Sequence, residues 1–542
     1  MLTLTIVAIL LVAVLAHVSG GRMARDGGIA PALDTRTMAV FVFVATFGIL
    51  WYSWAARTPM PVVHDELAYA FQAQVFARGL WALPPSPFPG FWEQPHVLVE
   101  PVVAAKYFPG HSLVLALGAR AGWMPLMPLL MQSGIGVLLF LLARRVAGGA
   151  VALLAWVIWL LTPMVLYFGP SYYSEGTTGL CWLAGWFALL EWRATRHVGW
   201  LLTLAALCAW CAITRPLTAV AFAVPVGVVV LRDSVAGWRW RDLALALVLG
   251  MAVLSILPLW SAHTTGDWRV TPLALYTRSY MPFDVPGFGV NTTTPLRTPA
   301  PELAQWVDSY ASIHVRHVPG VLLSAFAERV RYLYTSIWGA TSGLLGVFAI
   351  IGLLTMGGEA AFAVGTSVLL IVVYLVYATP ARWTLYYYEA TPAFAYLSAA
   401  GLAWAASMIG RPRGVPASPD YEWRAPRWAG ALTAAALVFA LSGAVTLRVI
   451  RAQHIADRRF LARFDTLLAS IHDPKAIVFA RYPRTHNPLE TLVQNVADPA
   501  VARIWVVFDR GEAANARLLA TVPDRKAYLF DAALGRTYQY EP

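Results

Sequence analysis

Residues 124–161 read MPLMPLLMQSGIGVLLFLLARRVAGGAVALLAWVIWLL, and this stretch decides the class of fold. It belongs to two apolar blocks, near 124–143 and 150–168, with Arg144 and Arg145 as the only charges between them. Each block has close to the ~20 residues that an α-helix needs to cross the hydrocarbon core of a bilayer. The stretch therefore predicts two membrane-spanning helices joined by a short turn that carries arginine.

The composition extends this prediction to the whole chain. Of the 542 residues, 58% are hydrophobic and 13% are charged, which is about half the ~25% charge content of soluble domains. This composition excludes a disordered chain and argues against an ordinary soluble enzyme. We expect an all-α polytopic membrane protein with about twelve spans. The expected spans lie near 2–18, 37–55, 124–143, 150–168, 177–191, 199–213, 216–231, 243–261, 336–355, 360–378, 388–408 and 428–447.

Arginine is distributed unevenly between the two sets of short loops. One set carries fourteen arginines, whereas the other carries Arg215 and Arg382. Because basic residues collect in cytoplasmic loops, the first set is expected to be cytoplasmic, with both chain ends outside. The net charge of +11 has the same explanation, and no basic run with interleaved aromatic residues indicates nucleic-acid binding. The fourteen are Arg22, Arg25, Arg36, Arg144, Arg145, Arg193, Arg196, Arg232, Arg239, Arg241, Arg411, Arg413, Arg424 and Arg427.

The large segments between spans all fall on the expected outer face. They are the loops 56–123 and 262–335 and the tail 448–542, and we expect the function on that face. We divide the chain into a transmembrane domain, 1–447, and a small extracytoplasmic α/β domain, 448–542. In the tail we expect strands near 476–482, 504–509 and 526–530, and helices near 489–496 and 515–520.

The first outer loop contains the strongest candidate for chemistry. Asp65 and Glu66 begin a segment, 65–79, whose apolar residues recur at helical spacing. Two acids at a helix N-terminus are favourable for the helix dipole and need no function. Their position directly outside a span nevertheless favours a catalytic role. The same loop contains His64, His96 and His111, which we expect to bind sugar or acceptor.

Lys106 is the only lysine in the first 474 residues of an arginine-rich chain. A compact ammonium near the membrane suits a phosphate or carboxylate. A lysine that snorkels to the membrane interface explains the residue equally well. The loop then closes with the segment Lys-Tyr-Phe-Pro-Gly, 106–110.

Two short outer turns, 169–175 and 382–389, place charges among tyrosines at the edge of the membrane, and a third, smaller turn, 214–216, carries Arg215. Such charges are costly there and often mark function, whereas tyrosines alone would be an ordinary aromatic belt. We expect Arg215 and Arg382 to bind the phosphate of a donor together with Lys106. The other members, expected to bind sugar or acceptor, are Tyr172, Tyr173, Glu175, Tyr387, Tyr388 and Glu389.

Together these pieces resemble the GT-C superfamily of integral-membrane glycosyltransferases, and within it the protein O-mannosyltransferase and aminoarabinose transferase group. The match covers roughly 37–408 and rests on Asp65 with Glu66, on the segment 106–110, and on the helix and turn that end at 143–148. The sequence departs from the family pattern in three features: Tyr-Phe-Pro follows the lysine in place of Pro-Pro, an extra span comes first, and the small tail domain is not assigned by the resemblance.

The resemblance implies a sugar donor carried on a polyprenyl phosphate, and a lipid, glycan or protein acceptor in the cell envelope. Asp65 would deprotonate or orient the acceptor hydroxyl, and the configuration at the anomeric carbon would invert. Glu66 could help position a divalent metal ion or the sugar, although the sequence does not establish a metal ion. We expect a multi-pass protein of the bacterial inner membrane whose active site faces the periplasm.

Two other functions fit the same membrane architecture. A transporter or flippase of lipid-linked sugars would usually show ionisable sites at the membrane midplane and repeats between its halves, and neither is evident. A non-catalytic envelope-assembly protein would tolerate changes at Asp65 and Lys106.

Overall fold

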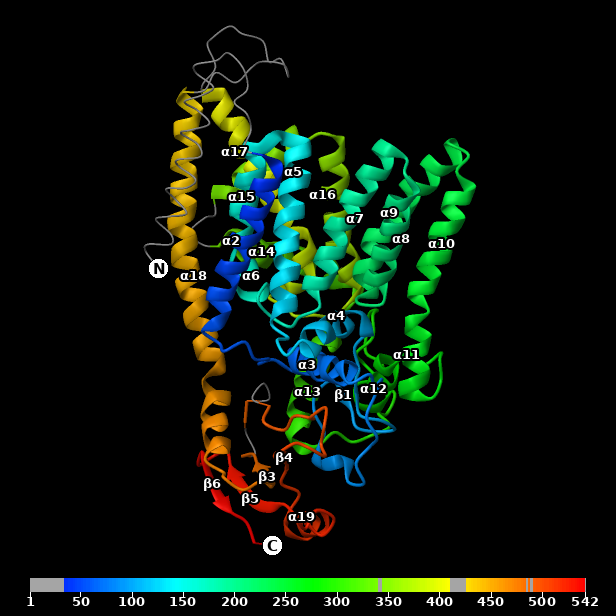
Figure 1. Ribbon diagram of the computed structural model, residues 1–542, viewed down its shortest axis with the longest axis vertical. Helices are drawn as coiled ribbons and strands as arrows, with labels where there is room; N and C mark the ends of the chain where they lie inside the picture. The colour runs from blue at the N-terminus through cyan, green and yellow to red at the C-terminus, as the bar shows by residue number, and fades with distance from the viewer. Residues whose placement is uncertain (1–33, 340–343, 410–425, 484–485, 488–490, 542) are drawn as a thin grey trace.

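The computed structural model describes residues 34–339, 344–409, 426–483, 486–487 and 491–541. Long helices form a bundle at one end of the molecule, and shorter helices and a sheet form the other end (Figure 1). The bundle helices are α2 (Thr35–Ala55), α5 (Leu126–Leu160), α6 (Pro163–Phe168), α7 (Glu175–Thr195), α8 (Val198–Ala212), α9 (Pro216–Ala236), α10 (Trp240–Leu254), α11 (Ile256–Thr265), α14 (Leu322–Trp338), α15 (Leu344–Thr355), α16 (Gly358–Val373), α17 (Thr391–Ile409) and α18 (Pro426–Ala469).

The stretch that decides the fold forms two antiparallel arms of α5. The helix is interrupted at Gly148, whose backbone has φ 83° and ψ 172°, a conformation that favours glycine. The chain folds back there, and the two arms pack against each other. A Cβ atom on Gly136 in the first arm would contact Trp156 and Trp159 of the second. The expected pair of helices with a short arginine-bearing turn is therefore observed.

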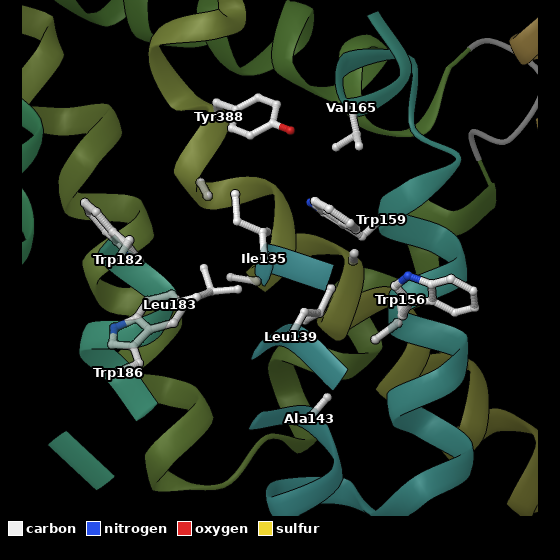
Figure 2. Packing of buried hydrophobic residues seen from close by; sticks show 14 of the residues in the cluster. Ile135, Leu139, Ala143, Trp156, Trp159, Val165, Trp182, Leu183, Trp186 and Tyr388 are labelled. Atoms are coloured by element: carbon white, nitrogen blue, oxygen red, sulfur yellow. The ribbon is translucent and has the colours of Figure 1, made fainter. Parts of the chain in front are cut away.

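The two arms of α5 and helix α7 enclose an apolar core, which Figure 2 shows from close by. Trp159 and Trp182 are completely buried within it. Burial of aromatic side chains of this size contributes most of the packing energy in such a core. The side chains labelled in the figure are Ile135, Leu139, Ala143, Trp156, Trp159, Val165, Trp182, Leu183, Trp186 and Tyr388.

Among the described residues, five helical segments are long and apolar enough to cross a membrane. Among the other expected spans, 177–191 coincides with the more polar helix α7 and 199–213 with the shorter helix α8. The first expected span, 2–18, lies outside the described residues. The number of about twelve spans therefore stays a prediction. The five segments are Thr35–Ala55, Leu126–Leu160, Pro216–Ala236, Trp240–Thr265 and Gly358–Val376.

The outer loops and the tail gather at one end of the bundle, opposite the turns that carry Arg145, Arg193 and Arg239 (Figure 1). Segment 56–123 forms α3 (His64–Ala77), η1 (Pro89–Phe91), β1 (Val97–Leu98), β2 (Ala104–Ala105) and α4 (Pro109–Arg120). Segment 262–335 adds α12 (Pro272–Tyr280), α13 (Pro301–Val315) and η2 (Pro319–Val321). Two short helices, η3 (Tyr374–Val376) and η4 (Thr384–Ala390), connect α16 to α17 at the same end.

The C-terminal part contains a four-stranded sheet in the order β4-β3-β5-β6. The strands β3 (Ala476–Arg481), β4 (Ile504–Phe508) and β5 (Lys526–Asp531) are parallel, and β6 (Arg536–Gln539) pairs antiparallel with β5. Helix α19 (Glu512–Leu519) precedes β5, close to the expected position. The edge strand β6 was not predicted from the sequence.

The prediction of a helix near 489–496 is wrong for residues 491–496, the part of this segment that the structure describes, because their backbone is irregular. The physical reason is that another segment takes the hydrogen bonds of this stretch. The backbone N–H of Asn495 donates to Gln94 Oε1 over 2.8 Å, and its side chain donates to the carbonyl of Trp92 over 3.0 Å. Tertiary contacts therefore replace the hydrogen bonds of a helix.

Helices α15 and α17 cross at two glycines. A Cβ atom on Gly401 would lie 1.8 Å from the carbonyl oxygen of Phe348, and one on Gly352 would lie 2.0 Å from that of Leu397. Small residues at such crossings let membrane helices approach each other closely. The contact between backbones is thus possible only because neither residue has a side chain.

We predict that Gly401→Ala lowers the stability of the detergent-purified protein by about 1–3 kcal/mol, because the added methyl overpacks the crossing. Thermal unfolding measures the change. The matched control is Gly365→Ala in α16, where nothing lies within 4 Å of the new methyl and where alanine favours the helix by up to about 1 kcal/mol. Equal melting temperatures for the two variants would contradict the proposed role of the crossing.

Candidate functional site

The N-terminus of α3 is held in place by Glu66, which is completely buried. One carboxylate oxygen accepts from Arg57 Nη2 over 2.7 Å and from the backbone N–H of Tyr172 over 3.1 Å. The other accepts from the backbone N–H groups of Val62 and Val63 over 3.1 and 3.4 Å. Four donors satisfy this carboxylate, so Glu66 anchors the helix to the bundle.

Asp65, the preceding residue, belongs to a different set of contacts. Its Oδ1 accepts a hydrogen bond from the hydroxyl of Tyr107 and lies 3.9 Å from Nε2 of His96. The side chain retains 38% of its accessible surface, so the carboxylate is reachable although protein surrounds it. Burial of the carboxylate by the surrounding protein raises the pKa of Asp65 above its usual value. The hydrogen bond from Tyr107 and the charge of Lys106 lower this pKa.

Aromatic rings shape the space around Asp65. The rings of Tyr69 and Tyr107 stack with centroids 4.5 Å apart, and His96 contacts the ring of Trp306 at 5.0 Å. Burial raises the pKa of Tyr69, and the charges of both Glu175 and Asp65 act in the same direction. Tyr69 therefore connects the surroundings of Asp65 to the neighbouring group of charges around Glu175.

Lys106 is enclosed rather than directed to the membrane interface. Its Nζ lies 3.5 Å from Asp284 Oδ2, and its side chain is 5% exposed. The ammonium also lies 5.0 Å from the ring of Tyr276 and 5.4 Å from that of Tyr107, distances typical of cation–π contacts. The second outer loop, 262–335, thus supplies a counterion to the lysine of the first.

Arg215 is the second buried cation. It forms an ion pair with Glu175 and donates to the hydroxyl of Tyr374 over 2.9 Å. Its guanidinium also lies 5.3 Å from the ring of Tyr386. The first outer loop approaches this turn closely at Gly110, where a Cβ atom would lie 2.3 Å from Thr214 Oγ1. Only a residue without a side chain fits there.

Several other expected site residues make structural contacts instead. His111 uses one ring nitrogen on Thr177 Oγ1 at 2.8 Å and the other on the carbonyl of Tyr172 at 2.9 Å. The hydroxyl of Tyr172 donates to the carbonyl of Pro59, and that of Tyr388 donates to Gln132. These contacts join the outer loops to the bundle.

The remaining expected residues differ in their accessibility. His64 points its Nδ1 to Thr491 Oγ1 at 2.8 Å. Glu389 is completely buried and accepts from Thr178, and Tyr387 is also buried. Tyr173 is half-buried, and burial raises its pKa, with Asp65 among the nearby charges. Arg382 is exposed, and its side chain makes no ion pair or hydrogen bond with any residue that the structure describes.

The arrangement does not fit a metal ion held by Asp65 and Glu66. Glu66 is saturated by Arg57 and three backbone N–H groups, and its carboxylate contacts a different set of residues from that of Asp65. Within the described part of the chain, no group of three or more His, Cys, Asp or Glu side chains could hold a metal.

Four residues at the centre of the site were not predicted as site residues. Tyr69 lies four residues after Asp65, so helical spacing would have placed the two on one face. Tyr107 directly follows Lys106 in the closing segment of the loop. Asp284 and Tyr386 come from distant segments of the sequence, and nothing in their local sequence indicates that they meet the first outer loop.

No protein-family model and no curated protein matches the chain. Solved structures do. The structure of ArnT from Cupriavidus metallidurans bound to undecaprenyl phosphate matches with a TM-score of 0.52 and 13% identity, over 90% of this chain and 92% of that chain. The apo structure of the same protein matches with a TM-score of 0.48, also at 13% identity, over 91% and 93%.

Arabinosyltransferase EmbB from Mycobacterium smegmatis matches with a TM-score of 0.42 and 14% identity, over 84% of this chain and 42% of that one. ArnT and EmbB are GT-C glycosyltransferases. The likeness to the lipid-bound ArnT structure, which extends over nine-tenths of both chains, confirms the GT-C fold expected from the sequence.

The anchor at Glu66 gives a direct prediction. Glu66→Gln removes the charge that neutralises buried Arg57, and breaking a buried pair in this way costs about 3–5 kcal/mol. Thermal unfolding should show a large loss of stability. Glu328→Gln, at an exposed position of α14, serves as the control and should leave the transition unchanged. A wild-type melting temperature for Glu66→Gln would show that the carboxylate does not act as an anchor.

Proposed function

We propose that this protein is a membrane glycosyltransferase that moves a sugar from a polyprenyl-phosphate-linked donor to a cell-envelope acceptor. One observation carries the proposal. A single accessible carboxylate, Asp65, lies among tyrosines beside the enclosed cation Lys106, within reach of the charges around Arg215. A base and phosphate-binding cations are the groups that transfer from a lipid phosphate requires.

In the proposed reaction, Asp65 accepts the proton of the acceptor hydroxyl as its oxygen attacks the anomeric carbon. The bond between that carbon and the phosphate oxygen breaks, and the lipid phosphate leaves with the bonding electrons. A single displacement by the acceptor oxygen, with one carboxylate acting as base, inverts the configuration at the anomeric carbon. The hydroxyl of Tyr107 donates to Oδ1 of Asp65, and Nε2 of His96 lies 3.9 Å from the same oxygen. Both residues would orient the carboxylate.

The leaving phosphate would be stabilised by Lys106 and Arg215. Each now faces a carboxylate, Asp284 and Glu175 respectively, so a bound phosphate would share the cation with that carboxylate. Arginine retains further donors when one edge is occupied, which suits this sharing. Exposed Arg382 would meet the donor at the edge of the bundle. We assign sugar or acceptor contacts to half-buried Tyr173 and to Glu175, the carboxylate partner of Arg215; Tyr387 and Glu389 are buried and are not assigned such contacts.

Two features support this assignment. The outer loops gather at the end of the bundle opposite the arginine-bearing turns (Figure 1), which the distribution of arginine predicts to be cytoplasmic. The reaction would then occur on the periplasmic side of a bacterial inner membrane, where nucleotide sugars have no ready supply. In addition, the ArnT structure that shares the fold contains undecaprenyl phosphate.

Asp65→Asn tests the proposal. The purified protein in nanodiscs is incubated with a panel of polyprenyl-phosphate pentoses and hexoses and with an envelope extract as acceptor, and release of polyprenyl phosphate is measured. We expect the variant to lose about 10²–10⁴-fold in rate. Asp308→Asn, at an exposed aspartate of α13, is the matched control and should retain full activity.

Full activity of Asp65→Asn would overturn the catalytic assignment. Movement of the intact lipid-linked sugar across the membrane without release of lipid phosphate would instead identify a flippase. Native mass spectrometry of the purified wild type for co-purified polyprenyl phosphate provides an independent readout.

The Tyr107 hydrogen bond predicts a shift in pH dependence. The bond favours the ionised form of Asp65 and so lowers the pKa that burial raises. Activity requires the carboxylate and is lost as pH falls through this pKa. Tyr107→Phe should therefore move the acid limb of kcat/KM to higher pH. Tyr538→Phe, at an exposed position, should leave the limb in place; an unmoved limb in Tyr107→Phe would argue against Asp65 as the base.

A further inference from the structure

Helix α18 continues beyond the bundle as an unbroken helix to Ala469, at the base of the sheet (Figure 1). Where it passes the end of α2, two of its side chains bind carbonyl oxygens of that helix. Arg451 Nη1 donates to the carbonyl of Tyr52 over 2.7 Å, and buried His454 contacts that of Ser53 at 3.1 Å. These contacts fix the inner face of α18 against α2.

An open cavity lies beside this junction, with a volume of about 350 Å³, within the range of about 300–1,000 Å³ that is typical of small-molecule sites. Its wall is apolar at Ala56, Ile455 and Ala462, and three arginines border it. The bordering cations are Arg458, Arg459 and Arg463, with Thr466 at one end.

Of the three arginines, one has protein partners and the other two are exposed to solvent. Arg458 donates to Thr58 Oγ1 over 2.7 Å and lies 3.9 Å from Asp465. Arg459 and Arg463 are exposed and have no ion pair or hydrogen bond with any residue in the described ranges. They stand four residues apart on one helix face, where like charges repel. An anion between them would remove that repulsion.

The same helix face leads from the membrane to these arginines. Val445 and Val449 are 55% and 61% exposed, and Ala452 and Ala456 are exposed one and two turns further along. The spacing of three and four residues continues to Arg459 and Arg463. This face is apolar at Val445, Val449, Ala452 and Ala456, with exposed Arg448 at its border, and it is basic at Arg459 and Arg463. Such a face matches the chain and headgroup of a lipid.

The rule that places basic residues in cytoplasmic loops does not account for Arg459 and Arg463. They lie at the end of the bundle opposite the short arginine-bearing turns, and the tail that contains them is too long to count in the orientation rule. We propose that this cavity binds the phosphate headgroup of an anionic membrane lipid, with the acyl chains against Val445 and Val449. This site is separate from the one around Asp65 and does not rest on the proposed glycosyltransfer.

Native mass spectrometry of the full-length protein, with equal amounts of palmitoyl-oleoyl phosphatidylglycerol and phosphatidylcholine added in detergent, tests this proposal. We expect the wild type to retain phosphatidylglycerol preferentially. Arg459→Gln with Arg463→Gln should weaken retention by about fivefold for each arginine, about 30-fold together. Lysine at both positions should restore it, which distinguishes charge from an effect on folding.

The matched control removes two exposed arginines from the sheet region, Arg517→Gln with Arg536→Gln, and should retain phosphatidylglycerol like the wild type. Equal loss in the two double variants, or equal retention of both lipids by the wild type, would overturn the site. Complete displacement of phosphatidylglycerol by low-millimolar inorganic phosphate would overturn the lipid as occupant in favour of a soluble phosphate.

Discussion

The buried carboxylate of Glu66 is the contact on which the outer half of the molecule depends. A charge removed from water must be compensated by partners, and here Arg57 from the end of α2 and the backbone of Tyr172 provide them. Arg57 lies at the start of the first outer loop, and Tyr172 lies in the turn before α7. The anchor therefore fixes the start of α3 relative to the bundle and leaves the neighbouring Asp65 to the surroundings formed by the later loops.

Those surroundings are assembled from parts of the chain that are far apart in sequence. Asp284 of the second loop faces Lys106, and Tyr386 of η4 faces Arg215. Thr491, in the C-terminal part, contacts His64, which directly precedes Asp65. The expected division of the chain at residue 447 falls within α18, and the candidate site draws on residues from both sides of it.

The local features of the sequence predicted the fold well, because they follow from local physics. The two arms of α5, the helix that begins at Asp65 and Glu66, and the strands β3, β4 and β5 each have a readable hydrophobic pattern. Asp65, His96 and Lys106 could be proposed together because they share one segment, and Arg215 and Glu175 could be proposed because they are charges at the edge of the membrane. The pairing of Lys106 with Asp284 and the saturation of Glu66 depend on tertiary packing, so the sequence could suggest charged residues but not their partners.

The unbroken helix α18 also constrains how this protein can vary. Each residue of an α-helix advances about 1.5 Å and turns about 100°. A single inserted or deleted residue between His454, which is bound to α2, and Ala469 would turn the sheet by that angle relative to the bundle. Thr491 and Asn495 would then miss His64 and Gln94. Relatives that preserve this arrangement should therefore keep the length of this segment constant while its exposed residues change freely.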